Sequence, residues 1–417
     1  MTATSDPVDI AIIGAGIIGG AIAFALTEAG RRVTLIDRKG LAEEASFGNA
    51  GAFAFSDILP LASPGILTKA PRWLIDPLGP LSLPPAYALA AAPWLWRFFR
   101  ASTPARFKAS LEAQAALMAL ARRETLPFLE RAGLDQEIVS HGALTLYESE
   151  KSFEAARAEW AHRDPYGIRY VHLDRAGIEA RQPGLSPRFR HATFIEDWHN
   201  VRDPHALAKS LGEAAIARGA TLKLAPVTAL EDTGDGVTIT FGNGSTLQAR
   251  TVILAAGAWS HRLAATIGDR VPLETERGYN TTLSRDAFDL KCQLIFSEHG
   301  FVVSPLGLGI RVGGAVELAG LARKPDYRRS RVMLDKTKAF LPALKTEGGK
   351  EWMGFRPSLP DSLPVIGRSP NARNVIHAFG HGHLGLTQSA ATARLVADLV
   401  ANANPAIDLA PFSPARF

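Results

Sequence analysis

The start of the chain shows a strand–helix–strand pattern. Residues 10–13 form a continuous apolar run, which is typical of a parallel strand buried on both faces. Apolar residues at 21–26 then follow the spacing of a helix, which Gly30 ends. Residues 32–36 form a second strand-like run, and Asp37 follows it. The pattern predicts that a parallel sheet begins here.

Further along, most of the chain alternates between helical and strand-like stretches, but one region contains mainly short strands. Helices are predicted at 104–133, 152–162 and 203–218 and from 387 onward, and strands at 143–147, 193–195, 221–224, 237–241, 246–250, 251–259 and 374–379. Between 270 and 320 short β segments dominate, at 271–273, 278–283, 293–296, 300–304 and 309–312. This change of style predicts a second domain with a largely antiparallel sheet.

A glycine motif joins the first predicted strand to the first predicted helix. Gly14, Gly16 and Gly19 form G-x-G-x-x-G, which allows a tight turn, the approach of a pyrophosphate and close helix–strand packing. The acid at position 37 can bind the hydroxyls of an adenosine ribose, which favours FAD or NAD over NADP. The alternative is a glycine-rich packing turn without a ligand.

A second glycine-rich loop precedes the last predicted helix. Residues 380–385 read Gly-His-Gly-His-Leu-Gly, and a helix N-terminus there would stabilise negative charge on the N1–C2=O side of a flavin ring. Small residues at 46–52 and at the end of the 251–259 strand would let the backbone lie against the same ligand. Two such turns far apart suit one long cofactor, although either could simply pack.

Composition narrows the class of protein. The 417 residues carry a net charge of +5 without a Lys/Arg block, so nucleic acid is not an expected partner. Cys292 is the only cysteine, which excludes a disulfide within the chain and argues against a cysteine-ligated metal; no metal site is predicted. The chain shows no signal-like start, and we expect a cytoplasmic protein.

The apolar segment 81–99 raises the question of a membrane contact. Pro84, Pro85 and Pro93 interrupt it, so we do not expect a spanning helix. It is either a core or subunit-contact helix or an amphipathic segment at the inner face of the cell membrane. The wider proline-rich stretch 60–93 is expected to wrap over the surface or cover the site.

Several longer motifs identify a family resemblance. They lie at 46–51, 276–279, 313–317, 352–364 and 379–387. With them the chain resembles, over nearly its whole length, the D-amino-acid oxidase/dehydrogenase superfamily of FAD-dependent oxidoreductases, particularly bacterial D-amino-acid dehydrogenase-like and glyphosate oxidoreductase-like proteins. The resemblance implies an α/β fold in which a Rossmann-type FAD-binding domain (1–78, 165–274 and 350–417) is interleaved with an α+β substrate domain (79–164 and 275–349) that carries a mixed, largely antiparallel sheet.

The resemblance also implies a reaction and its residues. FAD, expected to be noncovalent, would oxidise the C–N bond of a D-amino acid or related secondary amine, with O2 or a quinone as electron acceptor. Arg356 would bind the substrate carboxylate, or else pair with Asp361; Tyr279 would contact substrate, or else pack across strands; His383 would handle the amine proton, or else serve only through its backbone. The residues expected to bind FAD are Gly14, Gly16, Ile17, Ile18, Gly19, Asp37, Arg38, Ser46, Asn49, Ala50, Gly51, Val227, Ala256, Gly257, Gly380, His381, Gly382, His383, Leu384, Gly385, Leu386 and Thr387.

Two other functions remain open from the sequence. A flavin 2-hydroxy acid oxidase or dehydrogenase would use the same fold, and a noncatalytic flavoprotein subunit would relay electrons. The exact substrate and the oligomeric state are not specified by any motif.

Overall fold

The fold is that of a computed structural model, which describes residues 7–65, 79 and 81–417. Its first large sheet has the order β10-β2-β1-β13-β12-β11, with β20 beside β13 and β19 beside β20. Strands β1, β2, β10, β13 and β20 pair in parallel. The strands are β1 (Val8–Ile13), β2 (Val33–Asp37), β10 (Thr221–Leu224), β11 (Val227–Asp232), β12 (Val237–Phe241), β13 (Thr246–Leu254), β19 (Val365–Arg368) and β20 (Val375–Phe379).

The second large sheet is mixed and mostly antiparallel, with the order β18-β14-β17-β16-β15-β6-β8-β7 and β4 beside β17. Only the β15–β6 and β17–β4 pairs among its described strands are parallel. The strands are β4 (Leu81–Ser82), β6 (Ala143–Tyr147), β7 (Val171–Leu173), β8 (His191–Ile195), β14 (Glu274–Leu283), β15 (Gln293–Phe296), β16 (Phe301–Leu306), β17 (Gly309–Leu318) and β18 (Lys350–Ser358).

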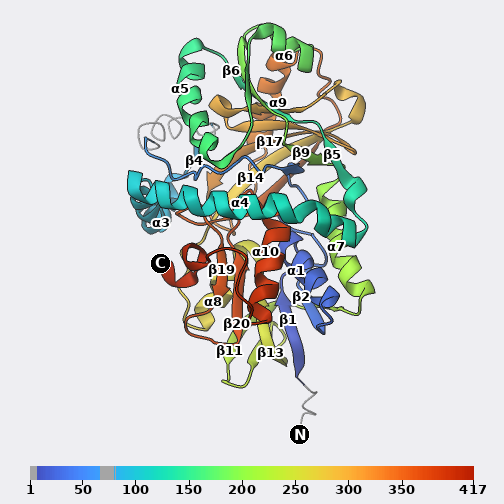
Figure 1. The fold of residues 1–417 in the computed structure, drawn as a ribbon, viewed down its shortest axis with the longest axis vertical. Coiled ribbons are helices and arrows are strands. Elements are labelled where there is room, and N and C mark those ends of the chain that lie inside the picture. The colour runs from blue at the N-terminus through green and yellow to red at the C-terminus, as the bar shows by residue number, and fades with distance from the viewer. Residues whose placement is uncertain (1–6, 66–78, 80) are drawn as a thin grey trace.

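Helices surround both sheets, and a small third sheet joins β3 (Ala52–Phe53), β9 (His199–Val201) and β5 (Ile138–Ser140). Figure 1 shows the first sheet in the lower half of the molecule, the second in the upper half, and α4 running across the middle. The helices are α1 (Ile17–Glu28), α3 (Ala88–Ala101), α4 (Pro104–Ala132), α5 (Glu150–Trp160), α6 (Arg175–Arg181), α7 (Pro204–Ala217), α8 (Ser260–Thr266), α9 (Arg328–Phe340) and α10 (Gly385–Val400).

The first glycine turn follows β1, an inner strand of the first sheet that is buried on both faces. Residues 10–13 of β1 are all buried, as their uninterrupted apolar run predicted. Helix α1 packs against α7 and α10, and α10 packs in turn against α4. The start of the chain and its last long helix are therefore neighbours, although more than three hundred residues separate them.

The α/β architecture with a mixed second sheet is confirmed, but several element predictions were wrong. Residues 246–259 do not form two strands: β13 is one strand that pairs first with β12 and then with β1, and 257–259 form a short 3-10 helix. Residues 271–273 form no strand, whereas β11, β18, β19 and α9 were not predicted. Prolines within and before β18 and β19 concealed those strands, because proline normally weakens a strand assignment.

The sheets also bear on the expected domain boundaries. Strands β7, β8 and β18 lie in segments assigned to the FAD-binding domain, yet they pair in the second sheet. The proposed division accordingly moves these strands to the substrate domain. Residues 66–78 and 80, which belong to the proline-rich stretch expected to cover the site, lie outside the described residues.

Candidate active site

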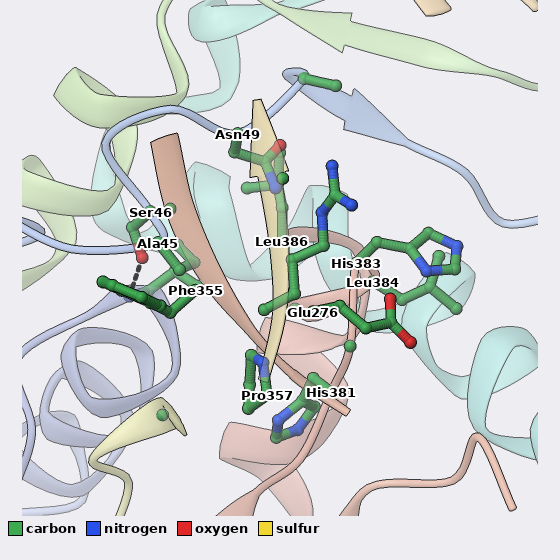
Figure 2. Close-up of a pocket in the computed structure, with 18 of the residues that line it drawn as sticks. Ala45, Ser46, Asn49, Glu276, Phe355, Pro357, His381, His383, Leu384 and Leu386 are labelled. Atoms are coloured by element: carbon green, nitrogen blue, oxygen red, sulfur yellow. Dashed lines mark hydrogen bonds between the residues drawn. The ribbon is translucent and has the colours of Figure 1, made fainter. Parts of the chain in front are cut away.

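A cavity of about 900 Å³ is lined by residues of both large sheets. It brings together nearly all of the predicted site residues, from the first glycine turn to the loop before α10. Of the predicted set, only Gly19 and Gly51 do not line it. Figure 2 shows part of this cavity, where the loop after β2, strand β18 and the loop before α10 meet.

The first glycine turn brings three chain segments into close contact. Gly14 has a φ of +105°, and a Cβ atom there would lie 2.3 Å from the carbonyl oxygen of Ala255. A Cβ atom at Gly19 would lie 1.8 Å from the carbonyl oxygen of Gly14, so close packing explains this glycine although it does not line the cavity. Gly16 is the N-cap of α1 and supplies no capping side chain. The start of α1 therefore offers backbone N–H groups to an anion in the cavity.

Asp37 and its neighbour shape the same end of the cavity. Asp37 Oδ2 accepts a hydrogen bond from the N–H of Ala15 at 2.9 Å, and Oδ1 accepts from the N–H of Lys39 at 2.7 Å. The guanidinium of Arg38 lies over the ring of Trp259, 3.9 Å from its centroid. The carboxylate of Asp37 and the guanidinium of Arg38 therefore lie at the same end of the cavity, where the adenosine part of a dinucleotide would bind.

The loop after β2 is held by helix α1 and by strand β14 of the second sheet. Ser46 Oγ accepts a hydrogen bond from the N–H of Ile17 at 3.0 Å, and Asn280 of β14 donates to the carbonyl of Gly48 at 2.9 Å. A Cβ atom at Gly48 would lie 2.1 Å from the indole of Trp352. Glycine is needed there because the aromatic ring packs directly against the backbone.

The second glycine-rich loop leads into the buried start of α10. Gly380 has a φ of +88°, and the N–H of Gly382 donates to the carbonyl of Pro357 at 2.8 Å. Leu384 is the N-cap of α10 and supplies no capping side chain. The N-terminus of α10 at the cavity is therefore free to interact with negative charge.

His381 is a neutral part of this loop. Its Nε2 lies 3.0 Å from Thr392 Oγ1, and the residue is only 5% exposed. Burial lowers the pKa of His381 to about 3, because the apolar surroundings disfavour the charged ring. We therefore assign it to the structure of the loop rather than to proton transfer.

This buried histidine is expected to make the protein acid-sensitive. The unfolded chain takes up a proton near pH 6.5 and the folded chain only near pH 3, so stability falls as the pH drops through this window, by up to about 1.4 kcal/mol per pH unit. Urea unfolding midpoints from pH 7 to 4 should fall less steeply in His381→Gln, whose amide can still reach Thr392. Equal slopes in both proteins would contradict the assignment.

Arg356 projects from β18 over the neighbouring strand. It lies opposite Glu276 in the β14–β18 register, and a Cβ atom at Gly278 would lie 2.3 Å from Arg356 Nη2. Nη1 donates to the carbonyl of Ala315 at 3.0 Å. A register shift of β14 against β17 and the left-handed conformation of Ala315, with a φ of +54°, present this carbonyl. Burial lowers the pKa of Arg356, and the negative charge of Glu276 counteracts this shift.

Asp361 does not pair with Arg356. Its carboxylate accepts hydrogen bonds from Arg416, with Nε 2.7 Å from Oδ2. The alternative that Arg356 is the ion-pair partner of Asp361 is therefore wrong, and the guanidinium remains available to the cavity.

The position of Tyr279 bears on the two roles expected for it, substrate contact or packing across strands. Gly278 and Tyr279 are neighbours within β14, so the side chain of Tyr279 points to the opposite face of the sheet from Gly278. The Tyr279 hydroxyl donates to Glu317 Oε2 at 2.6 Å and accepts from the N–H of Asp326 at 3.1 Å. Although Tyr279 borders the cavity, its hydroxyl is engaged in the core behind the sheet, which favours the packing role.

His383 forms a pair with a carboxylate that the sequence analysis did not select. Its Nε2 lies 3.1 Å from Asp57 Oδ2, and Arg163 lies near the same carboxylate. Burial raises the pKa of Asp57, but the hydrogen bond and charge of His383 and the charge of Arg163 outweigh it, so the net shift is downward. Asp57 is therefore an anion at neutral pH and fixes the orientation of His383.

Sequence reasoning missed several further residues that line the cavity. Glu276 and Trp352 belong to recognised motifs but were not selected as site residues; the others lie outside the motifs, and the full set is Asp57, Arg163, Trp259, Glu276, Asn280, Arg311 and Trp352. Arg311, for example, is 6% exposed and donates from Nη1 to the carbonyl of Asn49 in the loop after β2. Burial lowers its pKa to about 10. The sequence offered one signal for Arg311, which is a charged residue within the predicted strand 309–312. A charge buried in a strand needs a partner or a ligand.

These features fit the FAD that the family resemblance implies. The cavity is long enough to border both glycine-rich loops, and the N-termini of α1 and α10 reach it. At α1 the N–H of Ile17 is bound by Ser46 Oγ, and the N–H groups that follow it in the first turn remain for an anion. The close approach at Gly14 leaves the backbone bare where a pyrophosphate would bind.

Comparison with known proteins agrees with this geometry. Residues 9–399 match the family model described as FAD dependent oxidoreductase, DAO. The chain is 36% identical over 415 residues to a D-amino-acid oxidase of Bradyrhizobium diazoefficiens, covering 98% of each protein. It is 30% identical over 415 residues to a D-amino acid dehydrogenase of Sinorhizobium medicae, covering 98% of this chain and 99% of that one.

Solved structures show the same fold. Glycine oxidase from Geobacillus kaustophilus superposes with a TM-score of 0.78 at 23% identity, with 98% of each chain covered. Iminodiacetate oxidase from Chelativorans sp. superposes with a TM-score of 0.73 at 21% identity, covering 97% of this chain and 98% of that one.

Proposed function

The chain belongs to the DAO family of FAD-dependent oxidoreductases, and we propose that it oxidises the C–N bond of a D-amino acid or a related secondary amine, such as a cyclic imino acid or an N-substituted glycine. Bound FAD supplies the redox chemistry by accepting a hydride from the substrate carbon. Water then hydrolyses the imine product to a 2-oxo acid or aldehyde and an amine or ammonia.

The observation that supports this proposal most strongly is the guanidinium of Arg356 in the cavity wall. Among the described residues no carboxylate forms an ion pair with it, and its one hydrogen bond there is to the carbonyl of Ala315. A largely desolvated guanidinium with unused N–H groups is costly, whereas a planar carboxylate can satisfy its two outer N–H groups together. A substrate carboxylate bound here would orient the neighbouring C–N bond.

His383 is proposed to hold the amine proton. With its Nε2–H donated to Asp57, the lone pair of Nδ1 is left to accept a proton from a substrate ammonium. Loss of that proton frees the nitrogen lone pair, which oxidation to the imine requires. Asp57 acts as a positioning residue because it sets the tautomer of His383.

The reaction is tested by anaerobic titration of the purified holoenzyme. D-, L- and N-substituted amino acids are added singly, together with their 2-hydroxy acid counterparts, and loss of the oxidised flavin absorbance is recorded. We expect bleaching by one or more amines and not by hydroxy acids. Reduction by NADPH but by no amine would contradict the proposal.

For the electron acceptor we propose a membrane quinone, supported by the surface of α3. Its inner positions, Ala91, Trp94 and Ala101, are buried. Its outer positions include Leu89, Trp96 and Phe99, which are 90%, 59% and 40% exposed and lie near Arg97 and Arg100. Exposed aromatic and basic side chains on one helix face suit the surface of an anionic bilayer. No helix among the described residues is long and apolar enough to cross a membrane.

Replacing Trp96 and Phe99 together by serine is expected to weaken binding to phosphatidylglycerol vesicles by about tenfold, since each ring loses apolar burial in the bilayer. Vesicle co-sedimentation measures this. The matched control is Leu224→Ser, which removes an apolar side chain that is 64% exposed on β10. If the double variant sediments like the control, or if air reoxidises the reduced flavin faster than a quinone analogue does, the quinone proposal fails.

A further inference from the structure

Two opposite charges stand next to each other on the cavity wall without forming an ion pair. Glu276 of β14 and Arg356 of β18 are direct cross-strand partners, and both line the cavity. Such neighbours commonly form a salt bridge. Here the guanidinium extends over Gly278 to the carbonyl of Ala315, and no ion pair joins the two described side chains.

The carboxylate of Glu276 is held in a separate place. Its Oε1 accepts a hydrogen bond from Ser358 Oγ at 2.7 Å, and the residue is only 6% exposed. Among the described residues Oε2 has no hydrogen-bond partner. Figure 2 shows the carboxylate extending toward the loop that carries His381, His383 and Leu384. One oxygen of a buried anion is thus open to the cavity, on the side of the proposed proton acceptor.

We infer that Glu276 forms a binding site for the ammonium group of the substrate, an inference that rests on the function proposed above. A guanidinium and a carboxylate held apart on one wall match the two charges of a zwitterion. The carboxylate of an amino acid would bind Arg356 while its primary or secondary ammonium group donates to Glu276 Oε2. The substrate would therefore enter in its zwitterionic form and lose its proton to His383 only after binding.

The same arrangement selects against 2-hydroxy acids. A hydroxyl can donate one hydrogen bond to Glu276, but it carries no positive charge. The carboxylates of Glu276 and of the hydroxy acid would then share the single guanidinium of Arg356. A site built for a charged group discriminates against the analogue that lacks the charge, because the buried carboxylate of Glu276 is then left without a counter-charge. Glu276 is accordingly the residue that distinguishes amine from alcohol substrates.

The test compares ligands with and without an ammonium group on the holoenzyme. The probes are the amino acid that best bleaches the flavin, with its apparent Kd taken from the concentration dependence of anaerobic reduction, and propionate, with its Kd taken from the perturbed flavin spectrum. In Glu276→Gln we expect the Kd of the amino acid to rise at least about tenfold while that of propionate stays the same or falls. Ser358→Ala, which keeps the charge and removes only the bond to Oε1, should change both values by less than about threefold.

The outcomes separate the possible roles of Glu276. An unchanged Kd for the amino acid, or an equal rise for both ligands, overturns the inference; the second result would mean that Glu276 only supports Arg356. If no amine bleaches the wild-type flavin, the proposed function fails instead. Should Glu276→Gln not fold, the wild-type protein still decides: the 2-hydroxy acid with the carbon skeleton of the best amine must bind at least about tenfold more weakly, and equal affinity overturns the ammonium site.

Discussion

Replacing Arg356 by alanine is expected to lower kcat/KM for the best amine substrate by about 10² to 10³-fold while FAD stays bound. Truncating one partner of a buried, hydrogen-bonded charge pair costs about 2–5 kcal/mol, and here the substrate carboxylate is the partner left without its counter-ion. Steady-state kinetics measures the loss, and the visible flavin absorbance of the purified variant shows that the cofactor is retained. Arg356→Lys should recover only part of the activity, because an ammonium group lacks the planar fork of the guanidinium.

A second arginine provides the matched control. Arg416, near the end of the chain, binds Asp361 in the loop between β18 and β19, and it does not line the cavity. Arg416→Ala should therefore leave kcat/KM within about twofold of the wild type. It should lower stability by about 1–3 kcal/mol, because the mostly buried Asp361 and the carbonyl of Leu363 lose their donor. If Arg356→Ala turned over amines like the wild type, Arg356 would not bind the substrate carboxylate.

The nucleotide half of the cavity could be anticipated from the sequence because its chemistry is local. Gly14 and Gly16 permit a turn that other residues would obstruct, and Asp37 follows the next strand at a fixed distance along the chain. Backbone conformation and short spacing decide these positions. The loop before α10 was equally visible, because its glycines precede a clear helical pattern.

The substrate half could not be anticipated in the same way, because it depends on strand register. The motif at 276–279 was recognised, but the strand was predicted to begin at Gly278 rather than at Glu274. Side chains alternate between the faces of a strand, so the position of the strand decides whether Glu276 or Tyr279 faces the cavity. The β14–β18 pairing places Glu276 and Gly278 with Arg356 and turns the Tyr279 hydroxyl away.

Long-range contacts explain the other residues that were missed. Asp57 meets His383 from more than three hundred positions away, and Arg311 of β17 holds the carbonyl of Asn49. Neither contact follows a periodic pattern in the sequence. Each depends on the second sheet lying against the loops of the first, which is a property of the folded chain as a whole.

Replacing Gly14 by alanine is expected to give protein that does not retain FAD. The new Cβ would lie 2.3 Å from the carbonyl oxygen of Ala255, in a conformation with a φ of +105° that disfavours any side chain. The turn must move, which displaces the start of α1 from the pyrophosphate. We expect a loss of FAD affinity of at least about 10²-fold, or about 3 kcal/mol, and a lower thermal midpoint because the cofactor stabilises only the folded state. Flavin content after gel filtration and thermal unfolding with added FAD measure both.

Alanine substitutions at two other glycines distinguish the effect of the steric clash at Gly14 from the effect of its backbone strain. Gly30 is also left-handed, with a φ of +75°, but a Cβ atom there would have no neighbour within 4 Å, so Gly30→Ala should cost about 1 kcal/mol of stability and leave FAD bound. Gly16 has an ordinary φ, and its Cβ atom would lie 3.3 Å from Ser46 Oγ, which predicts an intermediate loss of FAD affinity. The expected order of effects on FAD binding is Gly14, then Gly16, then Gly30. If Gly14→Ala held FAD as tightly as Gly30→Ala does, the turn after β1 would not be the pyrophosphate site, because a bound cofactor could not tolerate so large a displacement of the backbone that contacts it.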